Sequence, residues 1–453
     1  MPFEHFNIKN ITIMGLGRYG GGIGVTRYLA AKYPNAHLTI TDLLSQAQLA
    51  DSIQSIEDLI TGNRITLHLG EHLTEDFTSA DLIIANPAVP KPWKNKYLLA
   101  AQESNIPITT EIRLLTEALP RNATTIGITG SAGKSTTASM IHHIMKGQNR
   151  TSHLGGNLGG SLLDTVHEIH EGAVIILELS SAQLYRLGKS IGYADAIGWS
   201  PDVAVLTNIN PNHLDWHETL EHYRTSKENI FRYQGGSDIA IRSEEIDYSL
   251  YDNVFEFMQL KVPGEHNQRN AILAAVTCQS AFGIDVRSSI RCLQSFAGLP
   301  HRLQLILETA PPNHLRFYND SKATTPEATL LAIRAFSDPS KIHLIAGGYD
   351  KKINLTIISQ LGPTLAGLYT IGLTGNTLAQ IANSPNAHYY ETLENAVKAA
   401  VSAMKPGDIL LLSPACASWD QFTNFEERGY TFEHIVKQLI SEQPISTSTG
   451  MPR

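Results

Sequence analysis

Short apolar runs alternate with helix-like segments along almost the whole chain. Residues 25–32 carry a helical pattern between strand-like runs at 11–17, 37–42 and 81–87. Apolar runs of this length, separated by helices, are typical of buried parallel strands. The pattern therefore predicts a parallel sheet flanked by helices near the N-terminus.

The same pattern restarts twice further along the chain. An apolar helix at 267–283 closes a second set of strand-like runs, at 124–130, 173–180 and 203–209. Residues 298–304 are interpreted as a linker to a third set, at 315–320, 341–348, 367–372 and 408–414. The sequence thus predicts an α/β fold of three domains, which we place at 1–110, 111–299 and 300–453.

Composition and charge exclude several classes of protein. The 453 residues are too many for one core, because domains usually hold ~100–200 residues. The net charge is −8 without a long basic run, so we expect no nucleic-acid surface. The three cysteines show no C-x-x-C spacing, which suits a reducing compartment. Because the chain also shows no signal-peptide pattern and no membrane-span pattern, we expect it to be cytoplasmic and not inserted in a membrane.

The stretch "GITGSAGKSTTASM" resembles a phosphate-binding loop between a strand and a helix. It departs from the usual G-x-x-x-x-G-K-[ST] pattern, because Ile128 stands where the first glycine is expected. The backbone N–H groups before a helix can still hold an anion, Lys134 can reach the β- and γ-phosphates, and Ser135 or Thr136 can bind Mg²⁺. The alternative interpretation is a plain glycine turn.

A second nucleotide signal lies near the N-terminus. Gly15, Gly17 and Gly20 form a G-x-G-x-x-G motif after a strand, and Asp42 ends the next strand. This is the dinucleotide-binding fingerprint, with an acid placed for a ribose. An NAD-dependent oxidoreductase, a non-catalytic nucleotide-binding scaffold and a turn that only packs strand against helix are the alternatives. The two signals together favour a protein that binds two nucleotide-like groups.

Further polar motifs follow in a fixed order: "LELSSAQL", "TNINPNHLDWH", "YRTSKENI", "GEHNQRNA", "GLPHRLQ", "NDSKATT", "GGYDKK" and "SPACASWDQFTNFEERG". Each motif alone has a structural explanation, such as a helix cap or a turn. Together with the G-x-x-G-K-S loop, the series resembles the Mur ligases, the ATP-dependent amino-acid-adding enzymes of peptidoglycan synthesis. The resemblance runs from Gly15 to about residue 437. The first, sixth and eighth motifs are specific to the branch that adds D-glutamate.

This resemblance implies a role for each domain. The first domain, with a dinucleotide-binding-like fold, binds the UDP of the substrate instead of NAD. The central domain, of the P-loop ATPase type, binds ATP. The C-terminal Rossmann-like domain brings the amino acid and closes over the nucleotide.

It also implies roles for single residues. ATP-contacting positions match Gly130, Ser131, Ala132, Gly133, Lys134, Ser135, Thr136, Asn267, Asn270, Arg302 and Asp320. Positions around the UDP-substrate match Gly17, Arg18, Asp42, Asn157 and His213, and those around D-glutamate match Lys322, Thr324, Lys351, Ser418 and Phe425. Metal-binding positions match Ser135, Glu178, His213 and Lys227, and catalytic positions match Lys134, His213, Lys227 and Arg302.

The reaction that the resemblance implies joins D-glutamate to UDP-N-acetylmuramoyl-L-alanine through an acyl phosphate. It uses ATP, two Mg²⁺ ions and a carbamoylated Lys227, and we expect a monomer. Uracil recognition is where the chain departs most from the family pattern. Leu43 and Leu44 follow Asp42 where polar contacts are usual, and Asn86–Ala88 replaces a more usual Ser-Pro-Gly.

Overall fold

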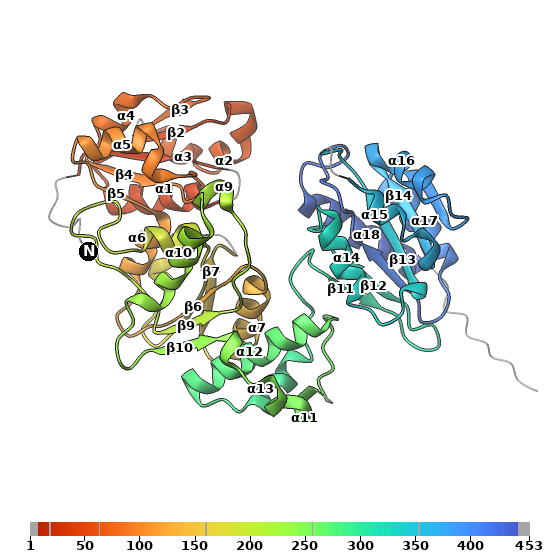
Figure 1. Ribbon diagram of the computed structural model, residues 1–453. Helices are drawn as coiled ribbons and strands as arrows, with labels where there is room; N and C mark the ends of the chain where they lie inside the picture. The colour runs from red at the N-terminus through yellow and green to blue at the C-terminus, as the bar shows by residue number, and fades with distance from the viewer. Residues whose placement is uncertain are drawn as a thin grey trace, which may run out of the picture. The chain divides into compact units, whose positions relative to one another are not determined.

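The computed structural model consists of two compact units (Figure 1). It describes residues 8–17, 20–62, 64–158, 161–255, 257–351 and 354–442. The first unit is Met1–Glu256 with Arg269–Leu293, and the second is Phe257–Gln268 with Gln294–Arg453. Within these described ranges, every helix is too short or too polar to cross a membrane.

The first sheet has five parallel strands in the order β3-β2-β1-β4-β5. Its strands are β1 Asn10–Met14, β2 His37–Asp42, β3 Ile65–Leu69, β4 Leu82–Ala85 and β5 Ile108–Thr109. The helices of this region are α1 Gly21–Lys32, α2 Ala50–Gln54, α3 Glu57–Ile60, α4 Thr74–Thr78, α5 Lys96–Glu103 and α6 Glu111–Ala118. Ile11 and Ile13 of β1 pack in one cluster with α1 and α6, and Met14 packs in another with α4 and α5.

The second sheet, also in the first unit, has five parallel strands in the order β10-β9-β6-β8-β7. Its strands are β6 Thr124–Thr129, β7 Ser152–Gly156, β8 Val174–Glu178, β9 Val203–Leu206 and β10 Ile239–Arg242. The helices are α7 Lys134–Gly147, α8 Ser181–Arg186, α9 Leu214–His217, α10 Leu220–Arg232, α11 Asp252–Phe255, α12 Glu265–Phe282 and α13 Val286–Leu293. The first four residues of α12, 265–268, belong to the second unit. The core of the first sheet continues into Ile175 and Leu177 of β8, which explains why both sheets belong to one unit.

The third sheet lies in the second unit and has the order β11-β12-β16-β13-β14-β15. Its strands are β11 Gln304–Glu308, β12 Arg316–Asn319, β13 Ile342–Gly347, β14 Gly367–Ile371, β15 Ala387–Glu391 and β16 Ile409–Leu412. All its pairs are parallel except β11 with β12. The helices are α14 Pro326–Arg334, α15 Thr356–Ser359, α16 Gly372–Ala382, α17 Leu393–Ala403 and α18 Phe425–Glu442.

Side chains of this third sheet alternate between two helical layers, as parallel strands buried on both faces require. Ile342 and Leu344 of β13 pack with α14, α15 and α16. Ile345, the residue after Leu344, packs with α17 and α18 on the opposite face. The result is a three-layer α/β/α arrangement.

The structure confirms the α/β class, the three sheets and every strand that the sequence predicted. It adds six strands that the sequence did not predict: β3, β5, β7, β10, β11 and β15. The three cysteines are free, as their spacing indicated. The domain limits at residues 110 and 299 stay predictions. The two compact units do not follow them, because the second unit contains residues 257–268 together with 294–453.

Candidate active site

The phosphate loop, Gly130–Gly133, connects the carboxyl end of β6 to the first residue of α7. β6 is the central strand of its sheet, with β8 on one side and β9 on the other. The strand order reverses there, and α/β folds bind ligands at such a switch point. Gly130 and Gly133 have φ angles of +151° and +82°, in a region that favours glycine. The loop therefore keeps its shape without the glycine that Ile128 replaces.

Residues that follow β9 hold this loop. Thr207 Oγ1 donates a hydrogen bond to the carbonyl of Ala132 (2.5 Å). The side-chain amide of Asn208 also donates to that carbonyl (3.0 Å), and its oxygen accepts from the Ala132 N–H (3.0 Å). These tethers fix the loop before any ligand binds, and sequence reasoning missed both residues.

The predicted ATP-binding residues of the loop lie where an anion would meet the start of α7. Lys134 is the first helical residue, and its Nζ donates to the carbonyl of Ser131 (3.3 Å). Ser135 and Thr136 are buried in the first turn. Asn270 lies against Gly133, since a Cβ on that glycine would be 2.7 Å from Asn270 Oδ1. A helix of this length attracts negative charge to its N-terminus.

Glu178 ends β8 and is 2% exposed. The Asn157 side chain donates to its Oε1 (3.1 Å). Its Oε2 is buried without a hydrogen-bond partner among the residues that the structure describes. A buried carboxylate oxygen without a partner is costly, so this atom is suited to bind a cation.

Lys227 on α10 lies beneath the loop and is 2% exposed, so it is not a solvated surface charge. Its Nζ donates to the Gly130 carbonyl (2.8 Å) and to Thr129 Oγ1 (3.3 Å). Burial lowers the pKa of Lys227 to about 7, Lys134 adds to the shift, and Glu178 opposes it. A large share of the amine is therefore unprotonated at physiological pH.

His213 and a group of aromatic side chains lie next to Lys227. Lys227 Nζ is 4.7 Å from the ring centroid of Tyr223, whose hydroxyl shares a hydrogen bond with Ser131 Oγ (2.9 Å). His213, just before α9, is 6.3 Å from the same ring. Partial burial lowers the pKa of His213; Asp215 opposes the shift, and Lys134 and Lys227 add to it.

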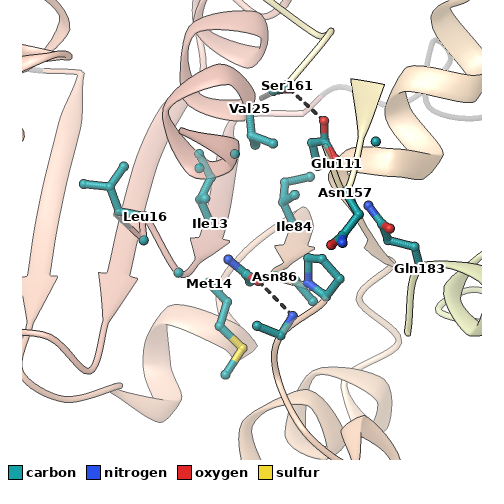
Figure 2. Close-up of a pocket in the computed structure, with 18 of the residues that line it drawn as sticks. Ile13, Met14, Leu16, Val25, Ile84, Asn86, Glu111, Asn157, Ser161 and Gln183 are labelled. Atoms are coloured by element: carbon teal, nitrogen blue, oxygen red, sulfur yellow. Dashed lines mark hydrogen bonds between the residues drawn. The ribbon is translucent and has the colours of Figure 1, made fainter. Parts of the chain in front are cut away.

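The first sheet carries a separate cavity of about 590 Å³ at its own switch point, between β1 and β4 (Figure 2). The loop after β1 and the start of α1 form one side. Asn86, Pro87 and Ala88 follow β4 and form another, and Ala88 N–H donates to Asn86 Oδ1 (2.9 Å). Side chains of the central domain, including Asn157 and Gln183, complete the wall.

Two of the five predicted UDP-substrate residues, Gly17 and Asn157, line this cavity. Asp42 is not among the lining residues, and its carboxylate accepts from the N–H groups of Gly17 (3.0 Å) and Leu44 (2.9 Å). His213 is also absent from the lining and lies beside the phosphate loop. Arg18 lies outside the described residues.

In the second unit, Asp320 is buried just after β12. Its Oδ1 accepts from Leu303 N–H (3.0 Å) and its Oδ2 from Ser413 Oγ (2.8 Å). Burial raises the pKa of Asp320 to about 7, against the effect of these hydrogen bonds and of Arg302. Both oxygens are already engaged, so the predicted ribose contact stays a prediction. Asn267 also lies in this unit, where its amide donates to the Pro263 carbonyl (2.7 Å).

Four of the five predicted D-glutamate residues lie on loops that follow strands of the third sheet, and the fifth, Phe425, begins α18. Lys322 Nζ is 5.3 Å from the ring of Phe425, at the start of α18. Lys351 Nζ is 4.9 Å from the ring of Trp419, which follows the buried Ser418. Thr324 lies two residues beyond Lys322, before α14.

Arg428 is a further residue that sequence reasoning missed. It is 1% exposed, and its guanidinium donates to Ser321 Oγ (2.9 Å), the Ser321 carbonyl (2.8 Å) and the Cys416 carbonyl (3.1 Å). These bonds tie α18 to the loops that carry Lys322 and Ser418. The only signal in the sequence is its place in the motif "NFEERG".

A phosphate loop at one switch point and a cavity at another define a nucleotide-using α/β enzyme. Two family models match the chain: the Mur ligase middle domain at residues 128–251, and the Mur ligase, glutamate ligase domain at residues 301–416. A protein from Koribacter versatilis named UDP-N-acetylmuramoylalanine–D-glutamate ligase is 32% identical, over 96% of this chain and 98% of its own. One of the same name from Geobacillus kaustophilus is 33% identical, over 97% and 99%. The chain belongs to the Mur ligase family, and within it to the UDP-N-acetylmuramoylalanine–D-glutamate ligases.

Solved structures agree on the fold. The UDP-N-acetylmuramate–alanine ligase of Thermotoga maritima matches with a TM-score of 0.55 and 18% identity, over 96% of this chain and 100% of its own. The MurF ligase of the same organism, solved with ADP, matches with a TM-score of 0.51 and 17% identity, over 89% and 96%. These two structures support the three-domain Mur fold. Membership of the family makes the chain a ligase that uses ATP.

Proposed function

We propose that this chain joins D-glutamate to UDP-N-acetylmuramoyl-L-alanine at the expense of ATP, in cytoplasmic peptidoglycan precursor synthesis. The observation that carries the proposal is the arrangement around the phosphate loop. A buried lysine, Lys227, lies below the loop, and a buried carboxylate, Glu178, has an oxygen free for a cation. The two substrates are inferred from the name that the relatives share, UDP-N-acetylmuramoylalanine–D-glutamate ligase.

A carboxylate does not condense with an amine at a useful rate in water. Transfer of the γ-phosphoryl group to the carboxylate of the UDP-substrate makes an acyl phosphate and releases ADP. The amine of D-glutamate then attacks the acyl carbon, and phosphate leaves. Lys134 and the loop N–H groups would stabilise the charge that develops on the transferred phosphoryl group. His213, whose ring is 6.3 Å from that of Tyr223, or a nearby base would assist deprotonation of the amine.

The residues around Glu178 fit Mg²⁺. Glu178 Oε2 and the hydroxyl of Ser135 are hard oxygen donors, and His213 lies near the same loop. In the described part of the chain, no cluster of three or more His, Cys, Asp and Glu side chains could hold a metal. Mg²⁺ commonly takes one or two carboxylates and completes its shell with water and substrate phosphates. Bound there, it would neutralise charge on the γ-phosphate.

Lys227 would add a carbamate to this set. Its neutral Nζ attacks CO₂, an N–C bond forms, and one N–H proton leaves to solvent. The product carries −1 instead of +1 and offers two oxygens to Mg²⁺. The lowered pKa of Lys227 favours this step, because only the neutral amine reacts.

Residues of α12 and of the C-terminal domain would bind the remaining groups. Arg302 would contact the γ-phosphate, Asn267 the adenine and Asp320 the ribose. Asn270, which lies against Gly133, would contact ATP at the phosphate loop. The residues assigned to D-glutamate are Lys322, Thr324, Lys351, Ser418 and Phe425. We further propose that the protein acts as a monomer of three domains, with limits near residues 110 and 299.

Omission of single substrates tests this function. Phosphate release should require ATP, Mg²⁺, UDP-N-acetylmuramoyl-L-alanine and D-glutamate together, and mass spectrometry should detect the UDP-linked dipeptide. Full release without the amino acid would identify a plain ATPase. Tight NAD binding without affinity for the UDP-substrate would support the oxidoreductase alternative.

A further inference from the structure

The cavity of Figure 2 contains a carboxyl group, Glu111, that the proposed mechanism does not use. We propose that Glu111 binds the sugar part of the UDP-substrate and selects for it. Its Oε2 would accept a hydrogen bond from a sugar hydroxyl or from the acetamido N–H. The inference rests on the proposed function, because it takes this cavity as the site of the UDP-substrate.

Glu111 is the first residue of α6, and its side chain lies on the cavity wall near Val25, Ile84 and Asn157 (Figure 2). Ser161 Oγ donates to Glu111 Oε1 (2.7 Å). No other residue in the described part of the chain hydrogen-bonds this carboxyl group, and Oε2 is not among the polar atoms sealed inside the protein. Oε2 therefore has a free lone pair and access to a ligand in the cavity.

The position of the carboxyl group is fixed before a ligand binds. Ser161 Oγ, besides donating to Glu111, accepts from the Leu163 N–H (3.2 Å). Helix α1 passes close to Ser161 at Gly24, where a Cβ would be 2.7 Å from Ser161 Cβ. A polar group held by its neighbours in this way is preorganised for binding.

Electrostatics decides which part of the substrate Glu111 can contact. A carboxylate repels a diphosphate, which is better placed at the start of α1, where the first turn carries no acidic residue. Burial raises the pKa of Glu111, the hydrogen bond from Ser161 opposes the shift, and Asp164 adds to it. Because these surroundings already disfavour negative charge, a neutral ligand group fits beside Glu111 better than an anion does. The neutral, donor-rich part of a UDP-N-acetylmuramoyl compound is its sugar.

Kinetics of the full-length enzyme test this contact. Glu111→Ala should raise the KM for UDP-N-acetylmuramoyl-L-alanine about tenfold, the usual effect of one lost hydrogen bond, and leave the KM for ATP unchanged. Glu111→Gln should stay within about threefold of wild type, because an amide oxygen still accepts. Glu117→Ala is the matched control, because Glu117 lies on the same helix, bonds Tyr193 and does not line this cavity.

Calorimetry with two probes then separates the sugar from the nucleotide. Glu111→Ala should weaken binding of UDP-N-acetylmuramic acid about tenfold and binding of UDP less than twofold. Equal weakening of both probes, or of neither, would overturn the proposal. Failure of the wild-type enzyme to bind UDP-N-acetylmuramic acid would overturn the proposed function itself, a result distinct from an unaffected variant.

Discussion

Lys134 is the first residue of α7, directly after the phosphate loop. Its ammonium group is therefore placed to stabilise negative charge on the phosphoryl group during transfer. Lys134→Ala should lower kcat about 10²–10³-fold, the typical cost of one transition-state contact. The fold should persist, because the helix keeps its glycine N-cap. Steady-state kinetics and circular dichroism are the measurements. Lys146→Ala, at the exposed end of the same helix, should retain full activity; an equally active Lys134→Ala would make the loop a simple turn.

Lys227 is predicted to act as a carbamate. Lys227→Ala should be almost inactive, and Lys227→Arg no better, because arginine cannot form a carbamate. A small carboxylic acid should restore part of the activity of Lys227→Ala by occupying the vacated ligand position. Mass spectrometry of the native enzyme should detect an added CO₂ on Lys227. Wild-type activity of Lys227→Arg would show that Lys227 acts as an ordinary cation.

The same lysine should make stability depend on pH. Its pKa is about 7 in the folded chain and near 10.5 when unfolded, so between these values the unfolded chain binds more protons at this site. The free energy of unfolding should therefore rise with pH across this window, by up to about 1.4 kcal/mol per pH unit.

Urea unfolding between pH 7 and 10 in CO₂-free buffer measures this slope. Lys227→Met should lose the contribution, and Lys146→Met, which replaces an exposed lysine, should keep it. An identical slope in Lys227→Met and wild type would contradict the lowered pKa.

Much of the site could be predicted from motifs, but burial and pairing could not. The local sequence around Lys227 is an ordinary polar helix, and only the packing of α10 under the loop reveals a buried amine. The pairing of Glu178 depends likewise on a residue distant in sequence, because Asn157 donates to Oε1 while Oε2 has no partner among the described residues. For Asp42 the motif predicts a ligand contact, which stays a prediction, but it did not indicate that the carboxylate accepts from the N–H groups of Gly17 and Leu44.

At the scale of elements, the phosphate loop depends on its glycines. Gly130→Ala would place a Cβ 1.9 Å from Thr207 Oγ1 at a φ of +151°. It should lower ATP affinity at least about tenfold, because the tether between the loop and β9 is displaced. Calorimetry with ATP and a thermal unfolding curve measure both effects.

Gly172 offers the matched control for this change. Its φ is +78°, but a Cβ there meets nothing within 4 Å. Gly172→Ala should therefore show only the conformational cost, about 1–2 kcal/mol, with unchanged ATP affinity. Equal ATP affinity in Gly130→Ala would mean that the loop tolerates a side chain and does not hold the phosphates closely.

The strands that could be predicted from sequence are the interior ones. Each sheet has two edge strands, and these are the six that were missed: β3, β5, β7, β10, β11 and β15. Interior strands are buried on both faces and form continuous apolar runs, such as the fully buried β9 and β16. Edge strands are short or partly exposed, as β15 is, so their apolar signal is weak.

At the scale of the whole molecule, topology places the two nucleotide signals. The glycine motif of the first domain and the phosphate loop of the second each follow the central strand of a parallel sheet. The sequence indicated both loops but left their ligands open. A ligase of this family uses both ATP and a UDP-linked acceptor, and we propose that the phosphate loop binds ATP and that the cavity of the first domain binds the acceptor.

The central claim is that ATP activates the carboxylate of the UDP-substrate. The most direct test uses UDP-N-acetylmuramoyl-L-alanine labelled with ¹⁸O in both carboxylate oxygens, together with ATP, Mg²⁺ and D-glutamate. The acyl-phosphate route transfers one of these oxygens to the γ-phosphorus and releases it with the phosphate. Mass spectrometry should therefore find one ¹⁸O in each phosphate and one in the new amide. Unlabelled phosphate would show that water accepts the phosphoryl group, and it would contradict this account.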